Sequence, residues 1–265
     1  MPEVRYRVGE REERVAARLV VGADGRSSHV RAWGAFSVER DPDCLTIAST
    51  LHEGLDAPEN SIQEAMHGSL RRVILIFPLG GGCHRTYLIH PSTDPLPRFS
   101  GMRDADRFVA ACGDSGLPAE WFGRAAQAGT LASFECASSW VSHPAGDGVV
   151  LIGDAAGSSD PAYGLGLSLT LRDVRLLRDH LIAQPDWRIA ADLYANDHDR
   201  AFDSLRRMTS WMTEMAFATG READATRGRA MPMIADDPTR VPDLAGVGPD
   251  AASDDYARQR YFGLV

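Results

Sequence analysis

The chain has 265 residues, of which 44% are hydrophobic and 25% charged, so it can bury a sizeable core as a globular protein. Its formal net charge of -9 and its scattered basic residues argue against a role in nucleic-acid binding. The four cysteines lie far apart without the short spacings of a metal site, which predicts reduced thiols and no bound metal.

The first 32 residues carry strand signals that end in an Asp-Gly pair. Alternating apolar residues over 4–8, a Gly-Glu turn and a second β-rich run over 15–22 predict a hairpin. The second run ends in a continuous apolar stretch, which predicts a buried strand that needs neighbouring strands on both sides. Asp24 and Gly25 follow this strand directly.

Residues 33–140 are expected to form a second domain built on an antiparallel sheet. Strands are predicted over 45–51, 72–78 and 85–90, with the glycines at 80–82 forming the turn between the last two. Two helices are expected on one face of this sheet, from Asp104 or Asp106 through about Cys112 and from Pro118 through about Ala128.

Residues 141–184 are expected to return to the first domain. The apolar run at 148–153 predicts a buried strand that leads into Gly153, Asp154 and Ala155. A helix should follow and end before Pro185, because five apolar residues recur close to a 3.6-residue period: Leu167, Leu171, Val174, Leu177 and Leu181. A strand followed by a helix is typical of α/β folds.

The remaining segments are expected to be a long helix and a tail. Over 185–230, Asp186 is expected to cap the long helix and Gly220 to stop it, with Leu205, Met208, Met212 and Met215 as an apolar seam. Over 231–265, four prolines and many aspartates predict an extended tail.

The end of the strand near residue 153 has the chemistry of a site for a flat ligand with a polyol chain. An acidic residue such as Asp154 accepts hydrogen bonds from vicinal hydroxyls, and its small neighbours let a ligand approach the backbone. Gly164 and Gly166 flank the start of the next helix, whose free amides and positive dipole end stabilise negative charge.

The segment around Asp24 and Gly25 and the segment that begins at Gly153 and Asp154 resemble the Asp-Gly and Gly-Asp motifs of the FAD-dependent monooxygenases related to para-hydroxybenzoate hydroxylase. The resemblance implies an α/β fold in which an N-terminally truncated FAD/NAD(P)-binding Rossmann-like domain carries an inserted β-sheet substrate domain and C-terminal helices. It also implies NAD(P)H as reductant and transfer of an oxygen atom from dioxygen to a small organic substrate.

The implied cofactor contacts transfer residue by residue. Asp154 would hold a ribityl hydroxyl of FAD, and Pro161 would lie beside the isoalloxazine ring. The Asp-Gly pair would lie near the pyrophosphate. The full set of predicted cofactor-binding residues is Asp24, Gly25, Arg26, Gly153, Asp154, Ala155, Pro161, Gly164, Leu165 and Gly166. No side chain is assigned a catalytic role, because the cofactor carries the reactive chemistry.

Departures from the family pattern leave alternatives open. Many aromatic hydroxylases have His where this chain has Gly157 and Asn where it has Ser168. A flavin reductase of the geranylgeranyl type is therefore an alternative, whereas the Trp-x-Trp-x-x-Pro signature of halogenases is absent. A second alternative is a non-catalytic fragment, since the Gly-x-Gly-x-x-Gly turn that seats the adenosine of FAD would lie before Met1.

The expected partners and location follow from these features. A small organic substrate is expected, together with either a homo-oligomer or an N-terminal segment that supplies the missing strands. No apolar stretch reaches the roughly 20 residues that span a bilayer, and the charged start is unlike a secretory signal, so a cytoplasmic protein is expected.

Overall fold

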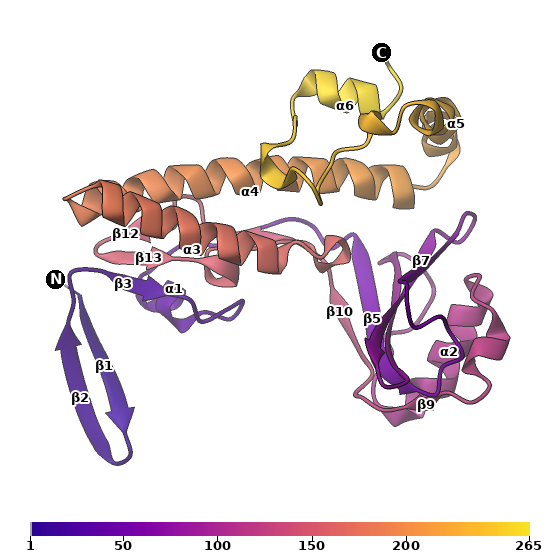
Figure 1. Ribbon diagram of the computed structural model, residues 1–265, viewed down its shortest axis with the longest axis horizontal. Coiled ribbons are helices and arrows are strands. Elements are labelled where there is room, and N and C mark those ends of the chain that lie inside the picture. The colour runs from indigo at the N-terminus through magenta and orange to yellow at the C-terminus, as the bar shows by residue number, and fades with distance from the viewer. Residues whose placement is uncertain (1) are drawn as a thin grey trace. The chain divides into compact units, whose positions relative to one another are not determined.

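The computed structural model describes residues 2–265, whose internal contacts separate into two units (Figure 1). Unit 1 combines residues 2–41, 138–211 and 229–265, and unit 2 combines residues 42–137 and 212–228. The chain thus leaves unit 1, builds most of unit 2 and returns. The α/β fold with an inserted antiparallel sheet and C-terminal helices, predicted from the sequence, is confirmed.

A three-stranded sheet forms the centre of unit 1, in the order β12 (Ala145–Gly146), β13 (Val149–Leu151) and β3 (Val20–Gly22). β3 and β13 are parallel. Within residues 2–265, β3 pairs with β13 alone, and Val21 is 44% exposed. The expected strand is present, and its unpaired edge and exposed Val21 are what is expected of an apolar strand that lacks one of its two neighbours.

The predicted hairpin is present as the antiparallel strands β1 (Glu3–Val8) and β2 (Arg11–Ala16). Glu3 pairs with Ala16 at one end of the ladder, and Val8 pairs with Arg11 at the other. Nearly every residue of both strands is exposed. The hairpin is held by its own ladder; one face is polar, whereas the other leaves Tyr6, Val8 and Val15 exposed.

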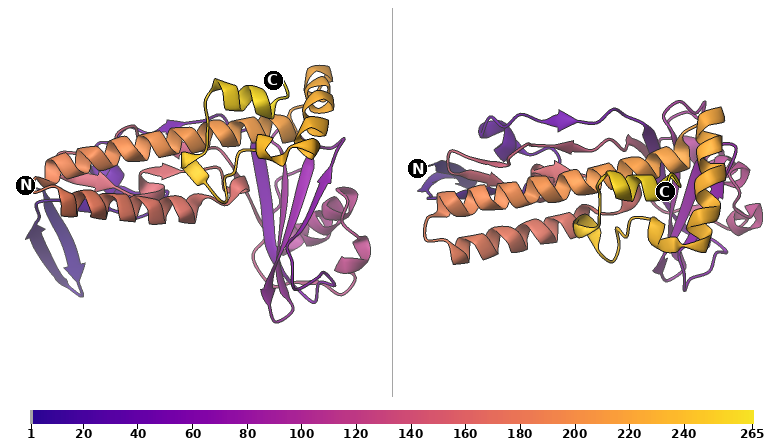
Figure 2. Two further views of the ribbon diagram at one scale, coloured as in Figure 1. Left: turned by 45° about the horizontal axis from the view of Figure 1, so that its top comes forward. Right: turned by 90° about the horizontal axis from the view of Figure 1, so that it is seen from above.

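Two long helices cover the sheet of unit 1: α3 (Gly166–Ala183) and α4 (Trp187–Phe217). α3 and the first part of α4 lie side by side in both views of Figure 2. Leu177 of α3 and Tyr194 of α4 share a core with Val150 and Ile152 at β13. Asp186 caps the start of α4 as predicted, because its carboxylate accepts from the amide of Arg188 at 2.9 Å.

The apolar stripe predicted for α3 is mostly on the wrong face. Of its five residues only Leu177 is buried, whereas Leu167 is 73% exposed and Leu171 is 62% exposed. The face that packs on the core carries Leu169, Asp173 and Leu177. Periodicity misled here because the helix has apolar residues on two faces, and one of the packed positions is an aspartate.

The C-terminal region contains more helix than expected. α4 ends before Gly220, whose φ is +99°, and α5 (Arg221–Asp236) begins directly after it, so residues 185–230 hold all of α4 and the first part of α5. The tail is not extended: α5 continues through Pro232, and α6 (Asp255–Tyr261) is capped by Asp254. Tyr261 and Phe262 are buried. The composition of the tail, with its many aspartates, did not indicate that these two residues would pack in a core.

Short elements complete unit 1 and connect the longer ones. Strand β11 (Ser139–Trp140) lies between β14 (Gly157–Ser158) and β4 (Glu39–Arg40) in a small sheet. The helical segments among them are α1 (His29–Trp33) and the 3-10 turns η3 (Gly153–Ala155), η4 (Pro161–Tyr163), η5 (Pro238–Arg240) and η6 (Gly248–Asp250).

Unit 2 is built on an antiparallel sheet in the order β10-β5-β8-β7-β6, with β9 also paired to β5. Three of these strands match the predicted ones, and a positive φ at each of the three glycines makes the predicted turn between β7 and β8. The strands are β5 (Leu45–Glu53), β6 (Gln63–His67), β7 (Arg72–Gly80), β8 (Cys83–Pro91), β9 (Ala126–Gln127) and β10 (Ala132–Glu135).

One face of this sheet packs on α2 (Ala105–Asp114), which follows the 3-10 turn η1 (Met102–Asp104), as predicted. Phe108 and Cys112 of α2 join Ile74 and Leu88 in the core. The second predicted helix, from Pro118 through about Ala128, is wrong. Only the 3-10 turn η2 (Ala119–Phe122) forms, because Gln127 instead pairs with His52 in the sheet.

Every helix within residues 2–265 is too short or too polar to cross a lipid bilayer.

Candidate cofactor-binding site

The two predicted motifs leave the same edge of the unit 1 sheet. In the parallel pairing of β3 with β13, Gly22 lies opposite Leu151, and the amide of Ile152 donates to the Gly22 carbonyl at 2.9 Å. Carboxyl ends of parallel strands gather at one edge, where α/β folds place their ligands. The prediction that both strands lie in one domain is confirmed.

Glycine is required at position 153, where β13 turns into η3. Gly153 has a φ of +58°, and a Cβ there would lie 2.7 Å from Oγ1 of Thr170. Both the left-handed backbone and the close approach of α3 exclude a side chain. The amide of Gly153 donates to Oδ2 of Asp173 at 2.8 Å, which fixes the plane of this peptide.

Asp154 has an available carboxylate. Its side chain is partly exposed and accepts no hydrogen bond from any of residues 2–265. Its Oδ1 lies 3.8 Å from the position that a Cβ on Gly166 would take. A carboxylate held beside a glycine with its acceptor positions free suits a ligand that offers hydroxyl donors.

The start of α3 offers backbone donors next to Asp154. Gly164 has a left-handed φ of +67°, and no side chain among the described residues caps the helix that begins at Gly166. The first amides of a helix lack intrahelical acceptors, and the helix dipole adds positive potential there. Because α3 spans 18 residues, its N-terminus is a strong dipole end for a ligand that bears negative charge.

Pro161 opens η4, which Asp160 holds in place. Oδ1 of Asp160 accepts from the amide of Ala162 at 2.8 Å, and the Asp160 amide donates to Oγ of Ser138 at 3.1 Å. Burial raises the pKa of Asp160 to about 6, although the hydrogen bond from Ala162 acts in the opposite direction. Sequence reasoning missed Asp160, whose only sequence signal is its position before Pro161.

Asp24 has a local structural role. Its carboxylate accepts from Oγ of Ser28 at 2.5 Å and from the amides of His29 and Val30 at 2.7 and 3.1 Å, at the start of α1. Burial acts to raise the pKa of Asp24, but these hydrogen bonds outweigh it and lower the pKa below its usual value. Both carboxylate oxygens of Asp24 thus accept hydrogen bonds from residues at the start of α1. Its predicted position near the pyrophosphate stays a prediction.

Arg31, which sequence reasoning also missed, joins the two motifs. Its Nη1 donates to the carbonyl of Ala155 at 3.2 Å, and its Nη2 donates to the carbonyl of Arg26 at 2.7 Å. One guanidinium therefore connects the segment after β3 with the turn after β13. Gly25, with a φ of +82°, gives the first segment its bend toward α1.

The departure from the family pattern at Gly157 has a packing explanation. A Cβ at this position would lie 2.6 Å from Cε2 of Phe202, a buried residue of α4. The aromatic ring from α4 thus occupies the volume in which a side chain at position 157 would start. Gly157 and Phe202 form a complementary pair in this chain.

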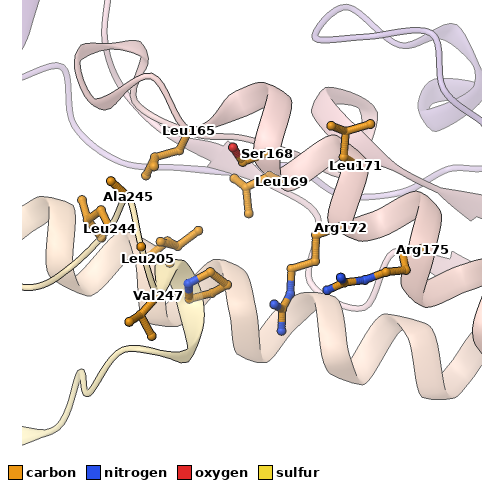
Figure 3. Close-up of a pocket in the computed structure, with 13 residues that line it drawn as sticks. Leu165, Ser168, Leu169, Leu171, Arg172, Arg175, Leu205, Leu244, Ala245 and Val247 are labelled. Atoms are coloured by element: carbon orange, nitrogen blue, oxygen red, sulfur yellow. The ribbon is translucent and has the colours of Figure 1, made fainter.

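A hollow of about 490 Å³ adjoins the start of α3, a volume in the range of small-molecule sites (Figure 3). Its apolar lining includes Leu165 just before α3, Leu169 of α3 and Leu205 of α4. The side chains of Arg172 and Arg175 extend from α3 at one end. Because Leu165 borders it, this hollow connects with the predicted flavin-contact segment.

The structure thus brings the predicted residues together in part. Gly153, Asp154 and Pro161 lie on short 3-10 turns between β13 and α3, and Gly166 is the first residue of α3. Asp24 and Gly25 leave the neighbouring strand at the same sheet edge. Within residues 2–265, no group of three or more His, Cys, Asp or Glu side chains is arranged to hold a metal ion.

Comparison with known proteins decides the family. Residues 1–201 match the model of a family described as an FAD binding domain. The chain belongs to this flavoprotein family. The predicted relationship to FAD-dependent oxidoreductases is therefore confirmed. No curated protein sequence matches the chain.

Solved structures agree on the fold. OxyS anhydrotetracycline hydroxylase from Streptomyces rimosus is 18% identical with a TM-score of 0.64, covering 99% of this chain and 49% of its own. CmlS, a flavin-dependent halogenase, is 16% identical with a TM-score of 0.66, covering 98% of this chain and 52% of its own.

A third structure was solved with ligands. Klebsiella pneumoniae HpxO, complexed with FAD and uric acid, is 18% identical with a TM-score of 0.64, covering 80% of this chain and 55% of its own. The chain thus spans about half the length of these structures. At these identities the likeness establishes the fold.

Proposed function

We propose that this chain holds the flavin and ribityl part of FAD in a NAD(P)H-dependent monooxygenase that hydroxylates a small organic substrate. The observation that carries this proposal is the unpartnered carboxylate of Asp154 beside the uncapped start of α3. These groups match the two chemically different parts of the cofactor, because a ribityl chain donates hydroxyl hydrogens and a reduced flavin ring carries negative charge.

The residues present fit FAD on this edge of the sheet. Asp154 would accept from the ribityl chain, and the amides near Gly166 would stabilise charge on the pyrimidine end of the ring. Pro161 would border the ring, and the Asp-Gly pair would lie near the pyrophosphate. When bound, FAD supplies the redox chemistry of the reaction. The protein contributes orientation, exclusion of water and fixed dipoles, so no side-chain nucleophile is required.

We propose hydroxylation as the activity, and the structural neighbours include both hydroxylases and halogenases. The OxyS structure is described as a hydroxylase, and the HpxO structure contains FAD with uric acid. Halogenases share the fold, but this chain lacks their Trp-x-Trp-x-x-Pro signature. A small organic substrate and NAD(P)H as reductant complete the proposal, and we propose the cytoplasm as its location.

The open edge of β3 supports a proposal about assembly. Its unpaired backbone groups and the exposed Val21 form a template for another strand. We propose that this strand comes from a segment outside the present sequence or from a second copy of the chain. A longer reading frame in the upstream DNA, containing a Gly-x-Gly-x-x-Gly turn, would support the first source.

Two measurements test the proposed function. The protein, extended wherever the upstream reading frame continues, is first titrated with FAD, and binding is followed by flavin fluorescence. NAD(P)H oxidation is then measured with a panel of phenolic substrates under isotopically labelled dioxygen. A monooxygenase gives a product that contains one labelled oxygen atom. Reduced products without label would overturn hydroxylation, and absence of any flavin binding would overturn the flavin role itself.

A further inference from the structure

A buried histidine lies behind the Gly153–Ala155 turn and has no role in the site described above. His198 of α4 is 3% exposed, and its Nδ1 lies 2.9 Å from Oδ1 of Asp173. The other carboxylate oxygen, Oδ2, accepts the amide of Gly153 at 2.8 Å. Asp173 therefore connects an imidazole from α4 to the peptide that precedes Asp154.

Two contacts fix the orientation of the His198 ring: the hydrogen bond with Asp173 at its edge and the stacking on Phe202 at its face. Its plane stacks on Phe202 with centroids 5.8 Å apart and an interplanar angle of 15°. Phe202 is itself fixed by its contact with Gly157. Because the oxygens of a carboxylate accept hydrogen bonds, we assign Nδ1 of His198 as the donor to Asp173. Nε2 is buried and has no partner among the described residues.

This arrangement is costly as a packing solution alone. A buried carboxylate must be removed from water, and a buried ring nitrogen without a partner adds a further penalty. Apolar side chains of similar size would fill the same volume without either cost. The polar chain has one specific effect: it fixes the direction of the Gly153 amide, and with it the backbone from which the Asp154 side chain projects.

We propose that His198 is a positioning residue for the Gly153–Asp154 turn, acting through Asp173. The proposal rests on the proposed flavin function of that turn. Without the Nδ1 donor, the Asp173 carboxylate keeps its interaction with Tyr194 but can rotate away from Gly153. The free carboxylate of Asp154 then loses its fixed direction. Sites of this kind require their groups within about 0.5 Å of the productive position.

Three variants separate positioning from packing. His198→Phe keeps a flat ring against Phe202 but removes the donor, and His198→Asn keeps a donor at the position of Nδ1. The matched control is His180→Phe, because Nε2 of His180 also joins α3 to α4 through Asp197 at 2.8 Å without contacting the turn. His198→Leu provides a second donor-free variant in case the phenylalanine variant does not fold.

The first readout needs no flavin. In protein labelled with nitrogen-15 at glycine, hydrogen exchange of the Gly153 amide should become about tenfold faster in His198→Phe than in the wild type. It should stay near the wild-type rate in His198→Asn and in His180→Phe. Unchanged exchange in His198→Phe and His198→Leu would overturn the proposal, whether or not the protein binds flavin.

The second readout is FAD affinity by fluorescence titration. We expect His198→Phe to bind FAD about tenfold more weakly, in the range found for residues that orient a ligand-binding group. His198→Asn should stay within about threefold of the wild type. Equal loss in the asparagine and phenylalanine variants would mean a packing role and would overturn the proposal. Absence of FAD binding by the wild type would instead contradict the proposed function, while the amide exchange still decides the role of His198.

Discussion

Arg31 donates to the carbonyl of Ala155 at 3.2 Å, although the two residues are 124 positions apart in the sequence. The same guanidinium donates to the carbonyl of Arg26 at 2.7 Å. A single side chain therefore sets the distance between the Asp-Gly segment and the Gly-Asp turn. The insertion of unit 2 between these segments makes such a connection necessary, because the short strands β3 and β13 share only three residue pairs.

Arg31→Lys should destabilise unit 1, because an ammonium group cannot donate to both carbonyls in the geometry of a planar guanidinium. We expect a loss of about 1 kcal/mol in the free energy of unfolding, the contribution of a partly buried hydrogen bond. Urea unfolding measures this loss. Arg175→Lys on the exposed side of α3 is the control and should change little. Equal stability of the Arg31 variant and the wild type would show that the connection is dispensable.

Asp154→Ala should weaken FAD binding by about 1.5 to 3 kcal/mol, because the ribityl hydroxyls lose a charged acceptor. This corresponds to about a 10- to 150-fold increase in the dissociation constant. Fluorescence titration measures the change, and Asp179→Ala on the exposed face of α3 serves as the control. If flavin content after dialysis is the same in both variants, Asp154 does not belong to the site.

The isolated 265-residue chain should bind FAD and FMN with affinities within about threefold of each other, because residues 2–265 contain no Gly-x-Gly-x-x-Gly turn to bind the adenosine part of FAD. Both affinities should be weak, and turnover should be absent. Parallel titrations with the two flavins test this expectation. Stoichiometric yellow flavin in the purified chain, with NAD(P)H oxidation, would contradict it.

Asp160→Asn should become increasingly stabilising as the pH rises. The pKa of Asp160 is raised in the folded state to about 6, so its ionisation opposes folding. The neutral Asp160 side chain contributes to the free energy of unfolding. This contribution is fully present below the unfolded-state pKa near 3.8 and is lost as the pH rises through the folded-state pKa of about 6.

The difference in unfolding free energy between Asp160→Asn and the wild type should therefore grow by about 1 to 2 kcal/mol from pH 4 to pH 7.5. Urea unfolding across this pH range gives the difference, in which other titrating groups cancel. The amide oxygen of asparagine can still accept from Ala162, so the cap is retained. A difference that does not vary with pH would show that Asp160 titrates normally.

Gly157→Ala should destabilise the protein by about 1 to 3 kcal/mol, because the added methyl overlaps the ring of Phe202. In a Phe202→Ala background, the same substitution should cost much less, since the ring is gone. A double-mutant cycle by chemical unfolding measures this coupling. Additive effects would mean that the two positions do not compete for space.

The local sequence determined several features well. The strand at residues 149–151, the glycine turn after it and the helix that follows are set by short-range chemistry: an apolar run, a residue that tolerates positive φ, and a break at Pro185. The hairpin at the start and the three long strands of unit 2 follow from alternation in the same way. These signals also located the Gly-Asp turn and the uncapped start of α3, the centre of the candidate site.

Tertiary packing decided what depends on partners distant in the sequence. The apolar stripe of α3 containing Leu167 and Leu171 is exposed, because the core at β13 receives the face that carries Asp173 instead. Gln127 joined a strand and not a helix, because the edge of β5 offered backbone hydrogen bonds. Periodicity predicts that a face exists, but only the surrounding elements determine which face is covered.

The same reasoning explains which site residues the sequence did not indicate. Arg31, Asp160 and His198 have no local pattern that separates them from ordinary surface residues. Their roles arise from contacts made after β3, β13 and α4 come together: a shared guanidinium, a buried cap and a carboxylate that joins α4 to Gly153. The sequence by itself determined the Gly153–Ala155 turn, for which we propose a flavin-binding role. The tertiary structure decided how that turn is held, because hydrogen bonds between distant segments exist only once the chain has folded.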